Sequence, residues 1–152
     1  MRALADALWD AFHTRADGDA GYSWVGFYFG PGLSFDDARA GDDEMILGPR
    51  RDKPACSPIG LHGACGRSFL EQRALVVTDV KHLGESYVAC DPRDQSEVVV
   101  PLFDEDGTCF AVLDVDAFDV GAFTEHDATE LIALLQRTGL TGSSPRAPTL
   151  VI

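Results

Sequence analysis

Three apolar segments of strand length constrain the fold of this chain most strongly: residues 22–29 (YSWVGFYF), 96–103 (SEVVVPLF) and 109–116 (CFAVLDVD). All are rich in the β-branched or aromatic residues that strands favour. DEDG separates the last two segments, and its Asp-Gly pair is typical of a tight hairpin turn. The sequence therefore predicts a sheet that contains this hairpin.

Amphipathic helices are expected near both ends of the chain. Apolar residues that recur every four positions predict a short helix over 2–14. A second apolar stripe, which Thr124 precedes as a helix-capping residue, predicts a helix that ends at Gly139. The other expected elements lie between these two: a strand at 45–47, a long loop over 49–66, a helix at 68–73 and a strand at 74–80.

The order of these elements predicts an α+β fold, in which helices lie on the faces of a central, largely antiparallel sheet. A chain of 152 residues fits one such domain, because domains usually contain about 100–200 residues. We expect the domain to occupy residues 1–140. Residues 141–152 are expected to form a loose C-terminal tail.

The charge of the chain argues against two classes of partner. Its 12 Lys and Arg residues and 25 Asp and Glu residues give a net charge of −13. Such a surface repels phosphate backbones and anionic lipid, so neither nucleic acid nor a membrane is expected as a partner. The first residues lack the continuous apolar stretch of a signal peptide, and no run approaches the roughly 18 apolar residues of a membrane span. We therefore expect a cytoplasmic protein.

The cysteines are candidates for chemistry, because thiols in the cytosol are usually reduced. Cys56, Cys65 and Cys90 fall in irregular stretches, where a thiol can be exposed and can move. Cys109 opens an apolar strand and is expected to be a small core residue. The long spacings between the first three differ from the close pairs of zinc sites, so no metal is expected. A cysteine hydrolase around Cys90 lacks a family signature, and redox exchange between thiols fits better.

Asp114 and Asp116 share one face of the strand at 109–116, since side chains alternate along a strand. Cys109 lies on the opposite face. From patterning alone we expect the strand to emerge into solvent at Asp114; the alternative is a pocket in which these acids converge. Glu97, next to an apolar VVV run, has the same two interpretations: a charge where the strand begins, or a third acid directed to the same place.

Four segments of the chain resemble successive motifs of the free methionine-R-sulfoxide reductases, which are stand-alone GAF domains. They are GYSWVGFYF at 21–29, LGPRRDKPACSPIGLHGACG at 47–66, TDVKHLGESYVACDPRDQSEVVVPLF at 78–103 and AVLDVDAF at 111–118. KPAC, the segment ACD-x₄-SE-x₃-PL and the LDVD strand are the most distinctive parts. The resemblance implies a GAF-like form of the α+β fold expected above.

The resemblance also implies an activity, the reduction of free L-methionine-R-sulfoxide to methionine without a cofactor. Cys90 matches the nucleophile of the family, and Cys56 and Cys65 match its resolving thiols, although Cys65 is one residue closer to Cys56 than in the family pattern. After the disulfide forms, the resemblance implies thioredoxin as the reductant that reopens it. A homodimer is one assembly that it implies.

The same resemblance assigns the substrate pocket. Glu97, Asp114 and Asp116 match acids that line it, and Trp24 and Tyr28 match its aromatic wall. A thiolate attacks the sulfoxide sulfur, and the oxygen must be protonated as it leaves. A carboxylic acid that neighbouring acids keep protonated can supply that proton.

The alternative hypothesis is a GAF module that binds a small ligand, or senses redox state through the same thiols, without turnover. A sensing GAF domain normally accompanies an output domain, for which 152 residues leave no room. Cys90 is followed by Asp91 rather than by the histidine of bilin-binding GAF domains. The sequence therefore favours the enzyme and leaves the thiol sensor open.

Overall fold

The computed structural model describes residues 1–14, 21–86, 90–143 and 145–152, and in them seven strands form one sheet in the order β5-β4-β1-β8-β7-β6-β9. These strands are β1 (Tyr22–Phe29), β4 (Glu44–Arg51), β5 (Ile59–Gly60), β6 (Leu75–Val77), β7 (Ser96–Phe103), β8 (Cys109–Ala117) and β9 (Leu150–Val151). The β6–β9 pair is parallel and the other pairs are antiparallel. A separate small hairpin consists of β2 (Ser34–Phe35) and β3 (Ala38–Arg39). The expected α+β architecture is confirmed.

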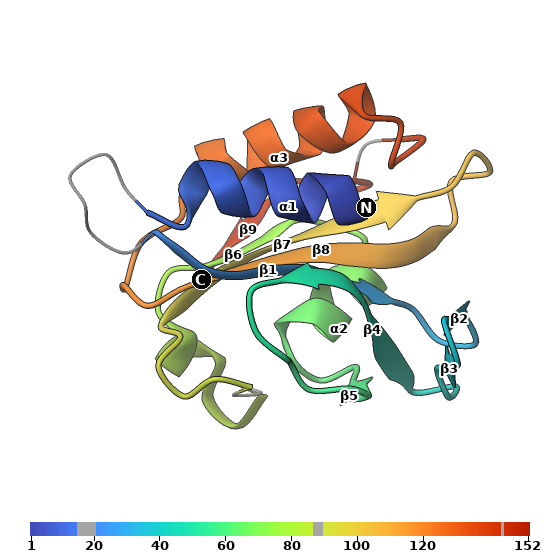
Figure 1. The fold of residues 1–152 in the computed structure, drawn as a ribbon, viewed down its shortest axis with the longest axis horizontal. Helices are drawn as coiled ribbons and strands as arrows, with labels where there is room; N and C mark the ends of the chain where they lie inside the picture. Colours follow the sequence, from blue (N-terminus) through green and yellow to red (C-terminus); the bar gives the residue numbers. More distant parts are fainter. Residues whose placement is uncertain (15–20, 87–89, 144) are drawn as a thin grey trace.

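Helices cover both faces of this sheet (Figure 1). Helix α1 (Arg2–Phe12) and helix α3 (Glu125–Arg137) lie on one face, and helix α2 (Ala64–Glu71) lies on the other. Helix α3 begins as expected, because Thr124 and Asp127 form a reciprocal capping box. A short 3₁₀ segment, η1 (Val80–Ser86), follows β6. None of the helices in the described ranges is long and apolar enough to cross a membrane.

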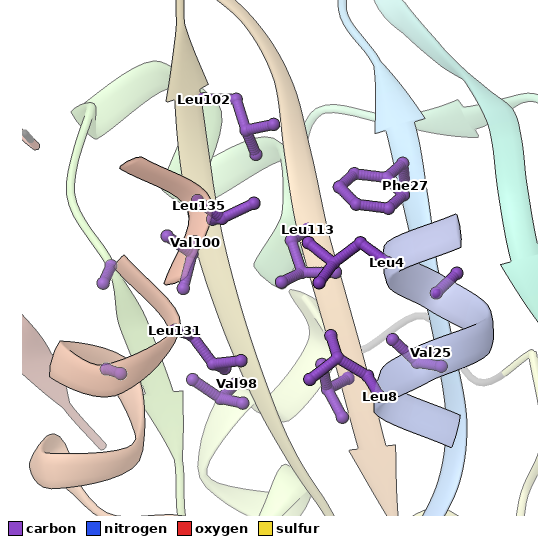
Figure 2. Close-up of a cluster of buried hydrophobic side chains, with 14 of the residues drawn as sticks. Leu4, Leu8, Val25, Phe27, Val98, Val100, Leu102, Leu113, Leu131 and Leu135 are labelled. Carbon is purple, nitrogen blue, oxygen red and sulfur yellow. The ribbon is translucent and has the colours of Figure 1, made fainter. Parts of the chain in front are cut away.

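Alternation along the central strands separates two apolar clusters. Figure 2 shows the first, in which α1 and α3 pack against β1, β7 and β8 through Leu4, Leu8, Leu131, Leu135, Val25, Phe27, Val98, Val100, Leu102 and Leu113. Residues of the opposite parity, such as Val99 and Val112, belong to the second cluster with α2. Cys109 is buried, as expected. Because the first cluster is continuous across three strands, it fixes which side chains of those strands point to the opposite face.

Two expectations about irregular segments are wrong. The stretch 49–66 is not a long loop, because β4 continues to Arg51, β5 occupies Ile59–Gly60, and α2 begins at Ala64. The tail expected over 141–152 is not loose at its end, because β9 pairs with β6 at the edge of the sheet. Both segments are polar or rich in Pro and Gly, so tertiary pairing rather than local propensity decides their structure.

Deletion of residues 149–152 is expected to lower the free energy of unfolding by about 2–3 kcal/mol. The deletion removes hydrogen bonds from Leu150 to Ala74, from Ile152 to Val76 and from Thr78 to Ile152. Urea unfolding of the wild type and the deletion variant measures this difference in the free energy of unfolding. Val151→Ala is the control, because this exposed side chain of the same strand is expected to contribute less than about 0.5 kcal/mol. An unchanged midpoint after the deletion would show that β9 contributes nothing to stability.

Candidate active site

A pocket lies on the face of the sheet that carries α2. Its walls come from β1, β7, β8, the first turn of α2, and segments near residues 53–55 and 90–94. The sequence-predicted residues that line it are Trp24, Tyr28, Cys65, Cys90, Glu97, Asp114 and Asp116. Cys56 is not among the lining residues, but it contacts Cys90. The fold thus brings together all the residues that the motifs selected.

Three carboxyl groups meet in this pocket because their strands are neighbours in register. Glu97 of β7 pairs with Asp116 of β8, while Asp114 faces Val99 on one side and Gly26 on the other. One carboxylate oxygen from each acid lies within 4.8 Å of the others. Asp114 and Glu97 are buried, with 6% and 8% of their surfaces exposed. The expectation that the strand emerges into solvent at Asp114 is therefore wrong, because β1 and β7 flank this part of β8 on both sides.

Burial raises the pKa of all three carboxyl groups well above its usual value, and their mutual repulsion raises it further. Among the charged neighbours, Asp116 acts most on Glu97, Glu97 acts most on Asp114, and Asp114 acts most on Asp116. Such carboxyl groups keep protons at pH values where exposed ones have lost them. The cluster can therefore donate a proton to a bound molecule.

Cys65 lies in the first turn of α2, where its Sγ donates a hydrogen bond to Asp114 Oδ2 at 3.2 Å. Only 6% of the residue is exposed, so the expectation of an exposed, movable thiol is wrong. The helix begins at Ala64, earlier than expected, and packs closely on the preceding segment: a Cβ at Gly66 would lie 2.3 Å from the Leu61 backbone. Burial and then Asp114 raise the pKa of the Cys65 thiol well above its usual value.

Trp24 and Tyr28 of β1 form an aromatic wall, with ring centroids 6.0 Å apart. Trp24 Nε1 donates to the carbonyl oxygen of Lys53 at 3.1 Å, and the Tyr28 hydroxyl donates to that of Cys56 at 3.0 Å. Gly26 lies between them on the same face, and a Cβ there would lie 2.3 Å from the Trp24 ring. The wall therefore depends on a glycine, and it holds the segment that carries Cys56.

Cys90 and Cys56 form a pair of neighbouring thiols, and neither is in a disulfide. The side chain and the backbone of Cys56 both lie close enough to the Cys90 thiol to change its pKa. Although both residues are exposed, partial burial of the Cys90 thiol, followed by the side chain of Cys56, raises its pKa to about 12. Cys90 is therefore protonated at neutral pH and must lose its proton while it reacts.

Lys53 and Asp91 also line the pocket, and they form an ion pair with each other. The sequence reasoning did not select them as site residues. Each is close to a cysteine in the KPAC and ACD motifs. The sequence does not show, however, whether a charged side chain beside a cysteine lies in a pocket or in solvent.

Among the residues that the structure describes, these three acids also lie close enough together to be considered as ligands of a metal ion. Hard divalent cations such as Ca²⁺ take roughly six to eight oxygen ligands, and the cluster offers one oxygen from each of its three members at this separation. A group of carboxyl groups with raised pKa is better suited to holding protons or to pairing with an organic cation.

A family model described as the GAF domain matches residues 1–140 of the chain. The chain therefore belongs to the GAF domain family. The resemblance to one branch of that family is confirmed by relatives named "Free methionine-R-sulfoxide reductase". The protein of that name from Saccharomyces cerevisiae is 32% identical over 122 residues, which is 79% of this chain and 61% of the relative. The one from Escherichia coli is 32% identical over 120 residues, which is 76% of this chain and 65% of the relative.

A solved structure is similar as well. The free methionine-R-sulfoxide reductase from Neisseria meningitidis, determined in complex with its substrate, superposes with a TM-score of 0.73 at 34% identity. The match covers 89% of this chain and 71% of that one. In contrast, the chain spans less than two thirds of the length of the relatives from Saccharomyces cerevisiae and Escherichia coli.

Asp114→Asn is expected to raise the free energy of unfolding at pH 8 by about 1–2 kcal/mol. The pKa of Asp114 is raised in the folded state. Asp114 therefore contributes fully to the free energy of unfolding only below the pKa of the unfolded state, about 3.9, and this contribution is lost as the pH rises. The advantage of the variant over the wild type should therefore shrink toward zero as the pH falls to 4. Urea unfolding from pH 4 to 8 measures it.

The control for the loss of one negative charge is Asp43→Asn, because Asp43 is exposed just before β4. A difference between Asp114→Asn and the wild type that did not grow with pH would contradict the raised pKa of Asp114.

Proposed function

We propose that this chain reduces free L-methionine-R-sulfoxide to methionine through a cycle of cysteine oxidation and reduction. One observation carries the proposal: Cys90, paired with Cys56, lines a pocket that also contains three carboxyl groups with raised pKa. Sulfoxide reduction needs a sulfur nucleophile and a proton donor for the departing oxygen. The names of the relatives point to the same reaction. Because thiols supply the electrons, the proposed reaction uses no cofactor.

In the first step the sulfur of Cys90 attacks the sulfoxide sulfur. The bond between the two sulfurs is transient: it breaks as the oxygen passes from the substrate sulfur to Cys90, so that one thiol and one sulfoxide give one cysteine sulfenic acid and one methionine. A protonated member of the acidic cluster donates to the oxygen as the bond to the substrate sulfur breaks, and the proton of the Cys90 thiol restores that acid. The raised pKa of Cys90 is compatible with this step, because its proton leaves during the attack.

In the second step Cys56 attacks the sulfur of the Cys90 sulfenic acid. A sulfur–sulfur bond forms, the sulfur–oxygen bond breaks, and the oxygen leaves as water with the proton of the Cys56 thiol. The contact between the two thiols supports Cys56 in this role. Thioredoxin then reduces the disulfide and its own dithiol is oxidised. Because this exchange needs a reducing compartment, a cytoplasmic location is part of the proposal.

Cys65 is proposed as the less important of the two resolving thiols. Its thiol is buried and donates a hydrogen bond to Asp114. This hydrogen bond would have to break before Cys65 could attack another sulfur. Substitution of Cys65 is therefore expected to act mainly through Asp114. A serine can keep the hydrogen bond, so Cys65→Ser should be milder than Cys56→Ser.

Free methionine sulfoxide suits the pocket because it carries an α-ammonium group, which a methionine residue within a protein lacks. A carboxylate of the acidic cluster can pair with this cation, which relieves the repulsion between the acids. Trp24 and Tyr28 would pack along the apolar part of the substrate. All these groups belong to one chain, so the proposed steps do not require the homodimer that the resemblance implies.

The alternative, a thiol redox sensor without turnover, would use the same cysteines. The deciding test is an assay for multiple turnovers of the separate R and S sulfoxides, with thioredoxin and thioredoxin reductase present.

Cys90→Ser is expected to abolish reduction, because a hydroxyl is a far poorer nucleophile than a thiol at neutral pH. Cys56→Ser should still release about one methionine per chain, since the first step does not use Cys56, but it should not be recycled by thioredoxin. Single-turnover and steady-state assays of methionine release measure both effects.

The matched control is Cys109→Ala, which removes a thiol on the opposite face of the same strand as Asp114 and should leave turnover nearly unchanged. Appreciable turnover by Cys90→Ser would show that the nucleophile is a different group.

N-acetylation of the substrate is expected to reduce kcat/KM about 30-fold or more. Acetylation removes the ammonium cation and leaves buried carboxylates unpaired, and truncation of such a charge pair costs roughly 2–5 kcal/mol. The measurement compares free and N-acetylated methionine-R-sulfoxide on one preparation. Comparable values would mean that the acids do not recognise the ammonium group, even if the cysteine cycle were correct.

A further inference from the structure

An ion pair joins the two segments that carry the thiol pair. Lys53 lies three residues before Cys56, and Asp91 directly follows Cys90. Lys53 Nζ donates to Asp91 Oδ2, and the two side chains are 24% and 12% exposed. None of the steps proposed above uses this ion pair.

The carboxylate of Asp91 accepts hydrogen bonds from two cations. Arg93 donates from Nε to Oδ1 at 3.0 Å and from Nη2 to Oδ2 at 2.7 Å, and Oδ2 also accepts the bond from Lys53. These hydrogen bonds, with Arg93 first and Lys53 second, hold the pKa of Asp91 well below its usual value. The ring of Phe118 lies against both cations, with its centroid 4.9 Å from Lys53 Nζ and 4.7 Å from Arg93 Cζ.

Each of the two segments is also attached to β1. The aromatic wall of β1 holds the segment that carries Cys56 through its backbone carbonyls, as described above. Ser23, also in β1, holds the segment that carries Cys90 by donating to Asp94 Oδ1 at 2.5 Å. Both segments are therefore anchored to one strand, and the Lys53–Asp91 pair ties them to each other.

We infer that the Lys53–Asp91 ion pair holds Cys56 and Cys90 close enough for a disulfide to close, and so sets the redox equilibrium of the thiol pair. Two thiols of one chain form a disulfide in proportion to the effective concentration that the fold gives them. An ion pair that limits the relative motion of their segments raises this concentration. Lys53 is thus a positioning residue: its part in catalysis rests on the proposed function, but its effect on the disulfide does not.

Equilibration of the full chain with mixtures of reduced and oxidised glutathione tests the inference without substrate. The two protein thiols are oxidised to the Cys56–Cys90 disulfide, and one oxidised glutathione becomes two reduced molecules. Lys53→Met and Asp91→Asn should each lower the equilibrium constant for this disulfide about tenfold, which corresponds to about 30 mV. Thiol alkylation followed by peptide mapping reads the disulfide. Because one variant removes a cation and the other an anion, an effect of charge alone would shift the two in opposite directions.

Arg93→Met is the matched control. Arg93 binds the same carboxylate and contacts the same ring, but it belongs to the segment of Asp91 itself and is 68% exposed. Its replacement should change the equilibrium constant less than about twofold, as is usual for an exposed ion pair. Lys53→Arg keeps the cation and should restore most of the loss seen in Lys53→Met.

A single-turnover experiment connects the ion pair to the proposed reaction. Lys53→Met should still release about one methionine per chain, because the first step as proposed uses Cys90 and a carboxyl group of the acidic cluster and not Lys53. The disulfide should then form about tenfold more slowly, and a sulfenic acid at Cys90 should accumulate, where a 1,3-dicarbonyl reagent can trap it. If the wild type released no methionine, the proposed function would fail, while the glutathione equilibrium would still test the ion pair.

Wild-type equilibrium constants in both Lys53→Met and Asp91→Asn would overturn the inference, and so would an equal loss in Arg93→Met. A higher KM for the sulfoxide in Lys53→Met, with an unchanged disulfide equilibrium, would overturn it as well and would assign Lys53 to substrate binding. If Asp91→Asn failed to fold by near-ultraviolet circular dichroism, the comparison of Lys53→Met with Lys53→Arg would decide.

Discussion

The pairing of β8 between β1 and β7 is the constraint on which the site depends. On one face of β8, Leu113 and Val115 belong to the apolar cluster under α1 and α3, and on the other face Asp114 and Asp116 line the pocket. A slip of one residue would exchange these faces and place carboxyl groups in the apolar cluster. The hydrophobic packing of one face therefore fixes the register that brings the acids of the other face together.

In the proposed reaction, burial of the acidic cluster links substrate binding to proton transfer. Because burial and mutual repulsion favour protonated carboxyl groups, the pocket carries less negative charge than its sequence suggests. An ammonium group that binds there favours the ionised form of one acid, and the proton of that acid must go elsewhere. The sulfoxide oxygen of the same substrate is a suitable acceptor. In the proposed reaction, binding of the cation at one end of the substrate thus helps protonation at the other end.

Much of the fold could be predicted from the sequence, because β1, β7, β8 and α3 have clear periodicity and turn or capping signals. The same parity argument separated Cys109 from Asp114, but it could not show whether Asp114 lies in solvent. That depends on β1 and β7, which flank β8 on both sides and come from distant parts of the chain. For the same reason the edge strand β9 and the early start of α2 were missed, and with α2 the burial of Cys65. The residue patterns offered the cysteines and the acids as candidates, while the resemblance assigned their roles and added Trp24 and Tyr28. Neither selected Lys53 or Asp91, which form an ion pair although they are 38 positions apart in the sequence.

The thiols and the acids of the site differ in their exposure, and this difference orders the proposed cycle. A protein reductant can attack only a sulfur that is exposed, and Cys56 and Cys90 are exposed whereas Cys65 is buried. A proton donor with raised pKa, in contrast, needs burial, which Glu97 and Asp114 have. Cys90 is the one thiol that both lines the pocket and contacts an exposed partner thiol. It is therefore the residue through which electrons from outside can reach a substrate held beside buried acids.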